Sequence, residues 1–282
     1  MTLRHHFTVD VEEYFHPTAL ARCYPASEWD SLERRSPRVM ARLLELLERR
    51  GVRATCFIVG WLAEREPEMV RALARAGHEI GSHGWEHELV ARLGPEGFRA
   101  SVRRSKRVLE DIAGRPVVGY RAPSFSIVPG LEWAFDVLLE EGYTYDASLF
   151  PVRRHPTYGY PDAQRYPHWI ERPGGTLLEI PSTTLRALGG TWPSAGGAYF
   201  RILPYAVLRA GLRQAEKEGA PGTFYIHPWE LDDWTPKIAA PAWQRLRTFS
   251  GRARIWERLG RALTDFEFGP VADTVEAMTA RA

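Results

Sequence analysis

The sequence predicts an α/β fold in which parallel strands alternate with helices, as in a β/α barrel or a doubly wound sheet. Three observations predict it. From residue 36 onward, segments with apolar side chains at helical spacing end at a glycine and are followed by short apolar runs. Those runs are apolar at nearly every position, which is typical of strands covered on both faces. With 282 residues, of which 44% are hydrophobic, the chain can bury one large core.

The expected elements follow one another in a regular order. Residues 7–9 form the first expected strand. Ser36 is placed to cap a helix that has Pro37 in its first turn and stops at Gly51, before the apolar run 52–59. Later units repeat this arrangement and bring the total to about seven strands. They are helix 67–76 and strand 78–81, helix 96–112 and strand 117–120, helix 131–140 and strand 144–146, strand 177–180, and helix 204–218 and strand 223–226.

Two regions do not fit this alternation. Residues 150–200 combine many aromatic side chains with prolines and glycines, so we expect an ordered segment near the site rather than a linker. The tail after Pro236 has large apolar residues at roughly helical spacing, which predicts a helical extension that packs on the barrel. These residues are Trp243, Leu246, Phe249, Trp256, Leu259, Leu263 and Phe266.

Charge and composition exclude several classes of protein. The 37 basic and 35 acidic residues are mixed along the chain and give a net charge of +2, so nucleic acid is not an expected partner. The first residues lack the pattern of a secretory signal, and no segment is apolar and long enough to span a bilayer, which predicts a cytoplasmic protein. Two cysteines are too few for a disulfide framework or a thiolate metal site.

Residues able to carry out chemistry lie directly after the expected strands. In a β/α barrel this is the face where active sites are built. Asp10 and Glu12 follow the first strand, and an arginine and a further histidine follow later strands. His83 and His87 are four residues apart, so that one helical turn or a tight loop can aim both at one ion.

A metal site follows from this grouping. With a third ligand from Asp10 or Glu12, the two histidines give a two-histidine, one-carboxylate site with open positions, which is typical of catalytic zinc. Co, Ni, Mn and Fe fit the same donors. Asp10 and Glu12 are two residues apart and therefore point to one side of an extended chain, where one can bind metal while the other takes a proton.

Five short motifs contain these residues, in the order in which they occur in a known family. They are Phe7-Thr8-Val9-Asp10-Val11-Glu12, Ser82-His83-Gly84-Trp85-Glu86-His87, Arg121-Ala122-Pro123-Ser124-Phe125, Tyr145-Asp146-Ala147-Ser148 and Tyr225-Ile226-His227-Pro228. Over roughly residues 5–230, the chain resembles the polysaccharide deacetylases of carbohydrate esterase family 4, the NodB-homology group.

Other segments resemble the subgroup encoded beside exosortase-linked exopolysaccharide clusters. They are residues 11–15, Gly196-Gly197-Ala198-Tyr199-Phe200-Arg201, His227-Pro228-Trp229-Glu230 and the tail. The resemblance implies a distorted (β/α)7 barrel over residues 1–235, with residues 236–282 as a C-terminal helical extension. It also implies hydrolysis of N-acetyl groups on N-acetylhexosamine units, with release of acetate. The substrate would be a polymeric glycan, a lipid-linked unit or a nucleotide sugar.

The resemblance also assigns roles. Glu12 joins His83 and His87 as metal ligand, and Asp10 is the base. The Asp-x-Glu spacing departs from the commoner adjacent Asp-Asp pair, so these two roles could be exchanged. Arg121 would hold the ionised base. His227 would protonate the leaving amine.

Further residues complete the expected site. Asp146 is expected to bond to His227, although the fourth motif lacks its usual tryptophan, and a backbone N–H from residues 148–150 is expected at the oxyanion. Five aromatic residues are candidates to line a sugar groove: Tyr14, Trp85, Phe125, Tyr199 and Trp229. Arg201 and Glu230 are candidates to contact hydroxyls.

Two other functions fit the same fold. One is hydrolysis of small cyclic amides, as in allantoinases. The other is glycan binding without turnover, for which loss of the base or of His227 would be the signature. The sequence has both residues.

Overall fold

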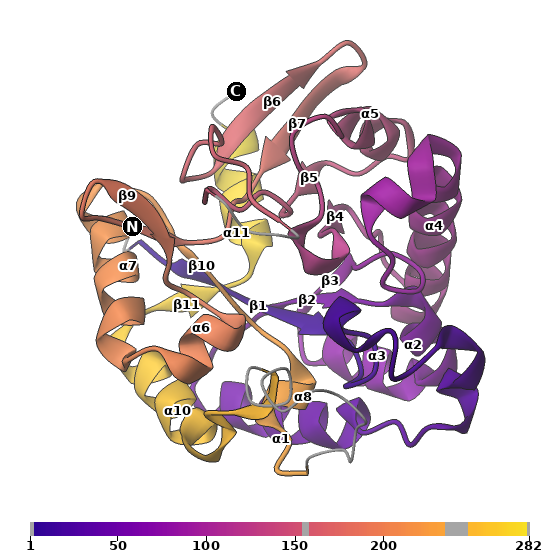
Figure 1. The fold of residues 1–282 in the computed structure, drawn as a ribbon, viewed down its shortest axis with the longest axis horizontal. Coiled ribbons are helices and arrows are strands. Elements are labelled where there is room, and N and C mark those ends of the chain that lie inside the picture. The colour runs from indigo at the N-terminus through magenta and orange to yellow at the C-terminus, as the bar shows by residue number, and fades with distance from the viewer. Residues whose placement is uncertain (1–2, 154–157, 235–247, 281–282) are drawn as a thin grey trace.

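A curled, mostly parallel sheet forms the centre of the molecule (Figure 1). The structure is a computed structural model, and it describes residues 3–153, 158–234 and 248–280. The strand order is β10 (Thr223–Ile226), β1 (His5–Val11), β2 (Thr55–Ile58), β3 (Glu79–Ser82), β4 (Gly119–Tyr120), β5 (Tyr145–Asp146), β7 (Gly175–Glu179) and β6 (His168–Arg172). Strand β6 is antiparallel to β7, whereas the other neighbouring strands are parallel.

The strand order selects the barrel type of fold. From β1 to β5 each strand lies beside the one before it, whereas a doubly wound sheet reverses its direction at a switch point. Strand β10 returns to pair with β1, which curls the sheet into a half-barrel. The predicted α/β fold class is therefore confirmed.

Helices cover the outside of the sheet. In Figure 1 they follow its rim from α1 (Ser36–Arg49) through α2 (Gly60–Arg65), α3 (Pro67–Arg75), α4 (Val90–Ala113) and α5 (Trp133–Glu140), with α7 (Tyr205–Lys217) and α10 (Ile255–Asp265) on the opposite side. Several strand residues, among them Phe7, Val9 and Ile58, are completely buried beneath them. Among the described residues, no helix combines the length and the apolar character needed to cross a membrane.

Helix α4 begins earlier than expected. Gly94 has a left-handed φ of 63° and interrupts the helix just before Pro95, which then opens the long regular part. The glycine is suited to this break because it has no Cβ to oppose positive φ, and the proline is tolerated because a first helical turn needs no N–H from it. The expected start at residue 96 corresponds to this second part.

The segment between residues 150 and 200 is ordered wherever the structure describes it, as predicted. It forms the β6–β7 hairpin, a second hairpin of β8 (Thr184–Ala187) and β9 (Gly190–Pro193), and the beginning of α6 (Gly197–Ile202). Except for a strand near 177–180, these elements are absent from the sequence prediction. Strand β6 contributes only partly buried residues on an edge, so its apolar pattern is weak.

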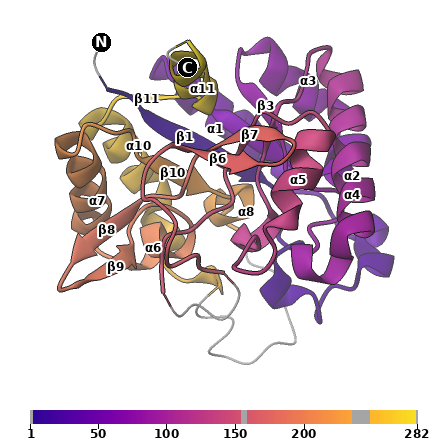
Figure 2. The ribbon, with the colours of Figure 1, turned by 90° about the horizontal axis from the view of Figure 1, so that it is seen from above.

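The C-terminal segment packs against the sheet and adds a strand to it. Strand β11 (Phe268–Gly269) pairs with the start of β1, and α11 (Val271–Thr279) follows. Figure 2 shows β11, α11 and the start of β1 on the same side of the molecule. Trp256 on α10 donates a hydrogen bond to the carbonyl of Leu231. Two residues of the expected tail helix, Trp243 and Leu246, lie outside the described residues.

Candidate metal and catalytic site

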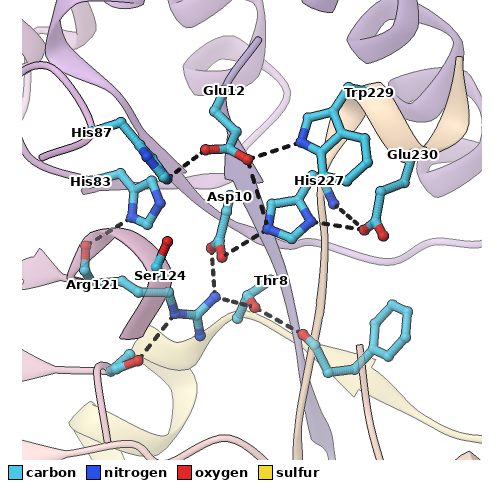
Figure 3. A network of polar contacts seen from close by, with 12 residues as sticks. Thr8, Asp10, Glu12, His83, His87, Arg121, Ser124, His227, Trp229 and Glu230 are labelled. Atoms are coloured by element: carbon cyan, nitrogen blue, oxygen red, sulfur yellow. Dashed lines mark hydrogen bonds and ion pairs between the residues drawn. The ribbon is translucent and has the colours of Figure 1, made fainter. Parts of the chain in front are cut away.

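The carboxyl end of β1 presents two acidic side chains to one side. Because side chains alternate along a strand, Thr8, Asp10 and Glu12 share a face, while Val9 and Val11 are buried on the other. Asp10 is in register with Phe57 of β2, so the carboxylates lie where the parallel strands end. Figure 3 shows that side chains from the segments that follow β3, β4 and β10 converge on them.

The two histidines of the second motif lie on a tight loop after β3. Gly84 (φ 73°) and His87 (φ 56°) both adopt left-handed backbone conformations, which fold the loop so that the imidazole centres are 5.2 Å apart. Positive φ is costly for a histidine and indicates a backbone that its surroundings hold firmly. The loop is anchored by hydrogen bonds from the amides of Gly60 and Trp61 to the carbonyls of Gly84 and Trp85.

Glu12, His83 and His87 form a cluster able to hold a metal ion. One ligand atom from each lies within 4.8 Å of the others, and all three residues are buried. The Nδ1–H of His83 donates to the carbonyl of Arg121 at 2.8 Å, so the lone pair of its Nε2 is free for a metal. Burial lowers the pKa of His83 to about 4, which keeps this imidazole neutral.

The carboxylate of Glu12 is also prepared for a cation. The indole N–H of Trp229 donates to Glu12 Oε1 at 2.9 Å. The other oxygen, Oε2, lies 2.6 Å from His87 Nε2 but makes no regular hydrogen bond to any described residue. Burial opposes ionisation of Glu12, but His87, with His227 and His83, outweighs it and lowers the pKa of this carboxyl group. Two imidazoles and one carboxylate fit a divalent transition metal.

Asp10 is held by a buried arginine. Nη1 of Arg121 donates to Asp10 Oδ1 and to Thr8 Oγ1, both at 2.7 Å, and its Nε donates to the carbonyl of Ala147 at 3.1 Å. Arg121 is 0% exposed. The charge-assisted pair expected between Arg121 and Asp10 is therefore present.

His227 lies at the carboxyl end of β10, across the site from the other histidines (Figure 3). Its Nε2 is 3.8 Å from Asp10 Oδ2 and 3.9 Å from Glu12 Oε1, and its ring stacks on the indole of Trp229 at 5.3 Å. Its Nδ1–H donates to Glu230 Oε2 at 2.8 Å.

Charge decides the protonation of the pair formed by His227 and Glu230. Burial opposes the imidazolium, but Glu230 outweighs this effect and raises the pKa of His227 to about 9. In return, His227 and Arg201 overcome the effect of burial and lower the pKa of Glu230 to about 2. His227 is thus a proton donor at neutral pH.

The expected bond between Asp146 and His227 is wrong. The carboxylate of Asp146 accepts hydrogen bonds from the hydroxyl (2.6 Å) and the amide (3.1 Å) of Ser148, and burial raises its pKa. The amide of Leu149 donates to Glu179 Oε1 at 2.9 Å. Because the amides of Ser148 and Leu149 already have partners, neither fits the oxyanion role expected of residues 148–150.

Arg201 and Glu230 do not have the exposed positions needed to bind sugar hydroxyls. Arg201 is 3% exposed and Glu230 is 0% exposed. The Nε of Arg201 lies 2.5 Å from Glu230 Oε1 in a buried ion pair. Glu230 therefore orients His227, and Arg201 neutralises Glu230.

The aromatic candidates divide into two groups. Tyr14, Trp85 and Phe125 are each less than 10% exposed. Their rings therefore have too little exposed surface to line a sugar groove as expected. The guanidinium of Arg104 also covers the Trp85 ring at 3.5 Å. Tyr199 and Trp229 are only partly buried. Tyr199 shares a hydrogen bond between hydroxyl groups with Tyr158.

One partner could have been found from the sequence. Glu230 is three residues after His227, and Pro228 stands between them at the first position of the short helix α8 (Pro228–Leu231). This is the spacing of a capping box, in which the third helical residue bonds back to the N-cap. The bond from Trp229 to Glu12 had no such signal, because the two residues are 217 positions apart.

Comparisons with known proteins find sequence similarity to deacetylases. The family model "Polysaccharide deacetylase" matches residues 27–131, and "Domain of unknown function (DUF3473)" matches residues 147–276. The chain is 32% identical over 110 residues to a peptidoglycan deacetylase of Helicobacter pylori, covering 38% of this chain and 36% of that protein. It is 31% identical over 94 residues to a peptidoglycan-N-acetylglucosamine deacetylase of Bacillus cereus, covering 33% and 34%.

The fold has solved counterparts. A Mycobacterium smegmatis structure described as a polysaccharide deacetylase superposes with a TM-score of 0.66 at 22% identity, covering 100% of this chain and 93% of the other. The matches span about a third of the length of the two curated relatives. Together, the family model and the relatives support the polysaccharide deacetylase family, and they do not favour a cyclic-amide hydrolase.

Proposed function

We propose that this chain, which those matches support as a polysaccharide deacetylase, is a metal-dependent N-deacetylase acting on N-acetylhexosamine units of a glycan. The observation that carries the proposal is the meeting of Glu12, His83 and His87 with Asp10 and His227 at one end of the sheet. A ligand set, a base and an acid lie within one site, which is what hydrolysis of an amide requires.

Glu12, His83 and His87 would hold a divalent metal, for which we propose Zn²⁺, with Co, Ni, Mn and Fe compatible with the same donors. When bound, such an ion supplies Lewis acidity that activates a water molecule and polarises the acetamide carbonyl. The carbonyl of Arg121 and the indole N–H of Trp229 support this ligand set, because the first holds His83 and the second holds Glu12 through a hydrogen bond.

Asp10 is the general base. Arg121 donates a hydrogen bond to its Oδ1, which orients the carboxylate and leaves Oδ2 on the side of the site that faces His227. Asp10 takes a proton from the attacking water as the new C–O bond forms. Because Asp10 and Glu12 share a face of β1, the base lies next to the ligand without competing for its position.

His227 is the general acid. An amine is a poor leaving group until its nitrogen is protonated, and the Nε2–H of His227 can donate that proton as the C–N bond breaks. Acetate and a free amino sugar are the products. Glu230 keeps His227 protonated and holds Nδ1, so that Nε2 faces the reacting nitrogen.

For the substrate, we propose a polymeric or lipid-linked glycan of an exopolysaccharide. The relatives are named for peptidoglycan, a polymer, and not for nucleotide sugars. The motifs at residues 196–201 and 227–230 support the exopolysaccharide subgroup, together with the tail. We also propose that residues 1–235 are the catalytic domain and that residues 236–282 are a C-terminal extension packed on the barrel.

Acetate release from N-acetylglucosamine oligosaccharides tests the proposal. We expect release by the Zn²⁺-loaded protein, its loss on chelation and its return when metal is added. His83→Ala should abolish release and stoichiometric metal binding. His168→Ala, which changes a histidine on β6, is the matched control and should keep both. Chelator-insensitive release would overturn the metal mechanism, and binding of glycan without turnover would favour a non-catalytic glycan-binding protein.

A further inference from the structure

A pocket lies next to His87, one of the three residues of the candidate metal site. The segment after β1 and the loop before α4 form it, and its walls include His16, Tyr24, Trp29, Glu86, His87 and Glu88. Its volume is about 140 Å³. That is much more than the roughly 10–15 Å³ that one ordered water needs, so the pocket has the size of a ligand site.

Two buried ring nitrogens in this pocket lack partners. Within the described part of the chain, neither His16 Nε2 nor His87 Nδ1 makes a hydrogen bond, although both atoms are buried. Buried polar atoms without partners are rare in folded proteins, and each calls for an explanation. The two rings lie nearly parallel, at an interplanar angle of 13° and a centroid distance of 6.3 Å.

Both nitrogens carry a proton and can donate a hydrogen bond. The amide of Glu13 donates to His16 Nδ1 at 3.1 Å, so the proton of the neutral His16 ring is on Nε2. In the proposed function, His87 binds the metal through Nε2, which leaves its proton on Nδ1. Two N–H groups are therefore available to donate to oxygen atoms of a ligand, and a protonated nitrogen does not serve as a metal ligand.

The other walls indicate the chemistry of that ligand. Glu86 and Glu88 can accept hydrogen bonds from hydroxyl groups of a ligand. Among the described residues that line the pocket, these two carboxylates outnumber the one guanidinium, Arg92, which disfavours an anion. Tyr24, which is only partly buried, offers apolar surface for C–H groups. Donors, carboxylates and aromatic rings together suit a neutral sugar. Ala21, Glu88 and Arg92 are exposed at the rim, so the pocket is open to solvent.

We propose that this pocket is a subsite for a neutral sugar ring of the glycan, with His16 Nε2–H and His87 Nδ1–H donating to its oxygens. The inference rests on the proposed function for the state of His87 and for the identity of the substrate as a glycan. It adds His16 as a substrate-binding residue and locates a sugar unit beyond the one that loses its acetyl group.

Binding of the N-acetylglucosamine tetramer to chelator-treated protein, measured by calorimetry, tests the subsite without turnover. We expect His16→Phe to weaken binding about fivefold to tenfold, which corresponds to the loss of one hydrogen bond. His16→Gln should restore most of the affinity, because its amide places a donor near the position of Nε2. His78→Phe is the matched control, since His78 Nδ1 also accepts a backbone N–H, from Ala54, but lies outside the pocket.

A second perturbation leaves His16 in place. Ala21→Trp fills the exposed rim and should weaken tetramer binding at least as much, which keeps the test open if the His16→Phe protein does not fold. Equal affinity of wild type, His16→Phe and Ala21→Trp overturns the subsite. Reduced Zn²⁺ affinity of His16→Phe with unchanged tetramer binding also overturns it, because His16 would then act on the metal ligand. If the wild-type protein releases no acetate but its binding of the tetramer still depends on His16, the proposed function is rejected and the subsite is kept.

Discussion

Glu230→Gln should move the alkaline limit of activity to lower pH. Glu230 is buried, bonds to His227 Nδ1 and raises the pKa of His227 to about 9. A general acid works only while protonated, so activity should persist up to that pKa and fall above it. Glutamine keeps the size of the side chain but removes the negative charge. Burial then opposes the imidazolium while Glu12 and Asp10 still favour it, so the pKa of His227 should fall to near the ordinary 6.5.

The magnitude follows from the two pKa values. At pH 8, a histidine with a pKa of about 9 is about 90% protonated, whereas one with a pKa of 6.5 is about 3% protonated. The variant should therefore lose about 30-fold in kcat/KM at pH 8, and the alkaline limb should move down by about two pH units or more. Near pH 5.5, where both proteins have a protonated His227, the difference should be small.

The assay is acetate release as a function of pH, with the same metal in both proteins. Glu132→Gln is a control that should keep the wild-type pH profile. Glu132 is at the N-cap of α5, away from His227, and accepts a hydrogen bond from the hydroxyl of Tyr160. Glu230→Gln also leaves Arg201 without its charged partner, so thermal melts should accompany the kinetics. A Glu230→Gln protein that folds and keeps its alkaline limb near pH 9 would refute the role of Glu230.

Three further predictions concern the same site. Trp229→Phe removes the N–H that binds Glu12 and should weaken Zn²⁺ binding about 10–100-fold, measured by competition with a chromogenic chelator; unchanged affinity would contradict the support role. Asp10→Asn should lower kcat about 10²–10⁴-fold with full metal content, whereas loss of metal would show that Asp10 is the ligand. Arg121→Met leaves the Asp10 charge buried without its cation and should lower the free energy of unfolding by about 3–5 kcal/mol in urea titrations. An unchanged free energy of unfolding would show that the ion pair does not stabilise the fold.

The parts of the fold that the sequence predicted are those with strong local signals. Helix α1 begins close to the expected position, with Pro37 in its first turn, and β10 has its expected bounds because its run is fully buried. The expected cap is wrong: Arg35 is at the N-cap without a side-chain cap bond, and the hydroxyl of Ser36 donates to Glu13 instead. The β8–β9 hairpin and β11 were missed. Their residues are partly exposed or very few, and the pairing of β11 with β1 joins residues far apart in the chain, which no local pattern records.

The site was predicted to a similar degree. Residues that end strands, such as Asp10, His83 and His227, meet as expected because parallel strands end on one face. Partners within that face were harder to assign. Asp146 was assigned to His227, but it bonds to Ser148, and Glu230 makes the bond to His227. The capping-box spacing of His227 and Glu230 was the local signal for the correct partner. Burial of Arg201 was likewise beyond reach, since arginine is usually exposed.

The position of β1 has a consequence for folding during synthesis on the ribosome. Strand β1, which carries Asp10 and leads directly into Glu12, is made long before β10, its partner on one edge. His6 and Thr223, which bond across that edge, are 217 residues apart. Until then, the nascent chain holds a strand with an open edge, which is prone to wrong pairing. Docking of β10 and β11 onto β1 is therefore expected to be the slow step of folding, and the two carboxylates reach their working positions only after it.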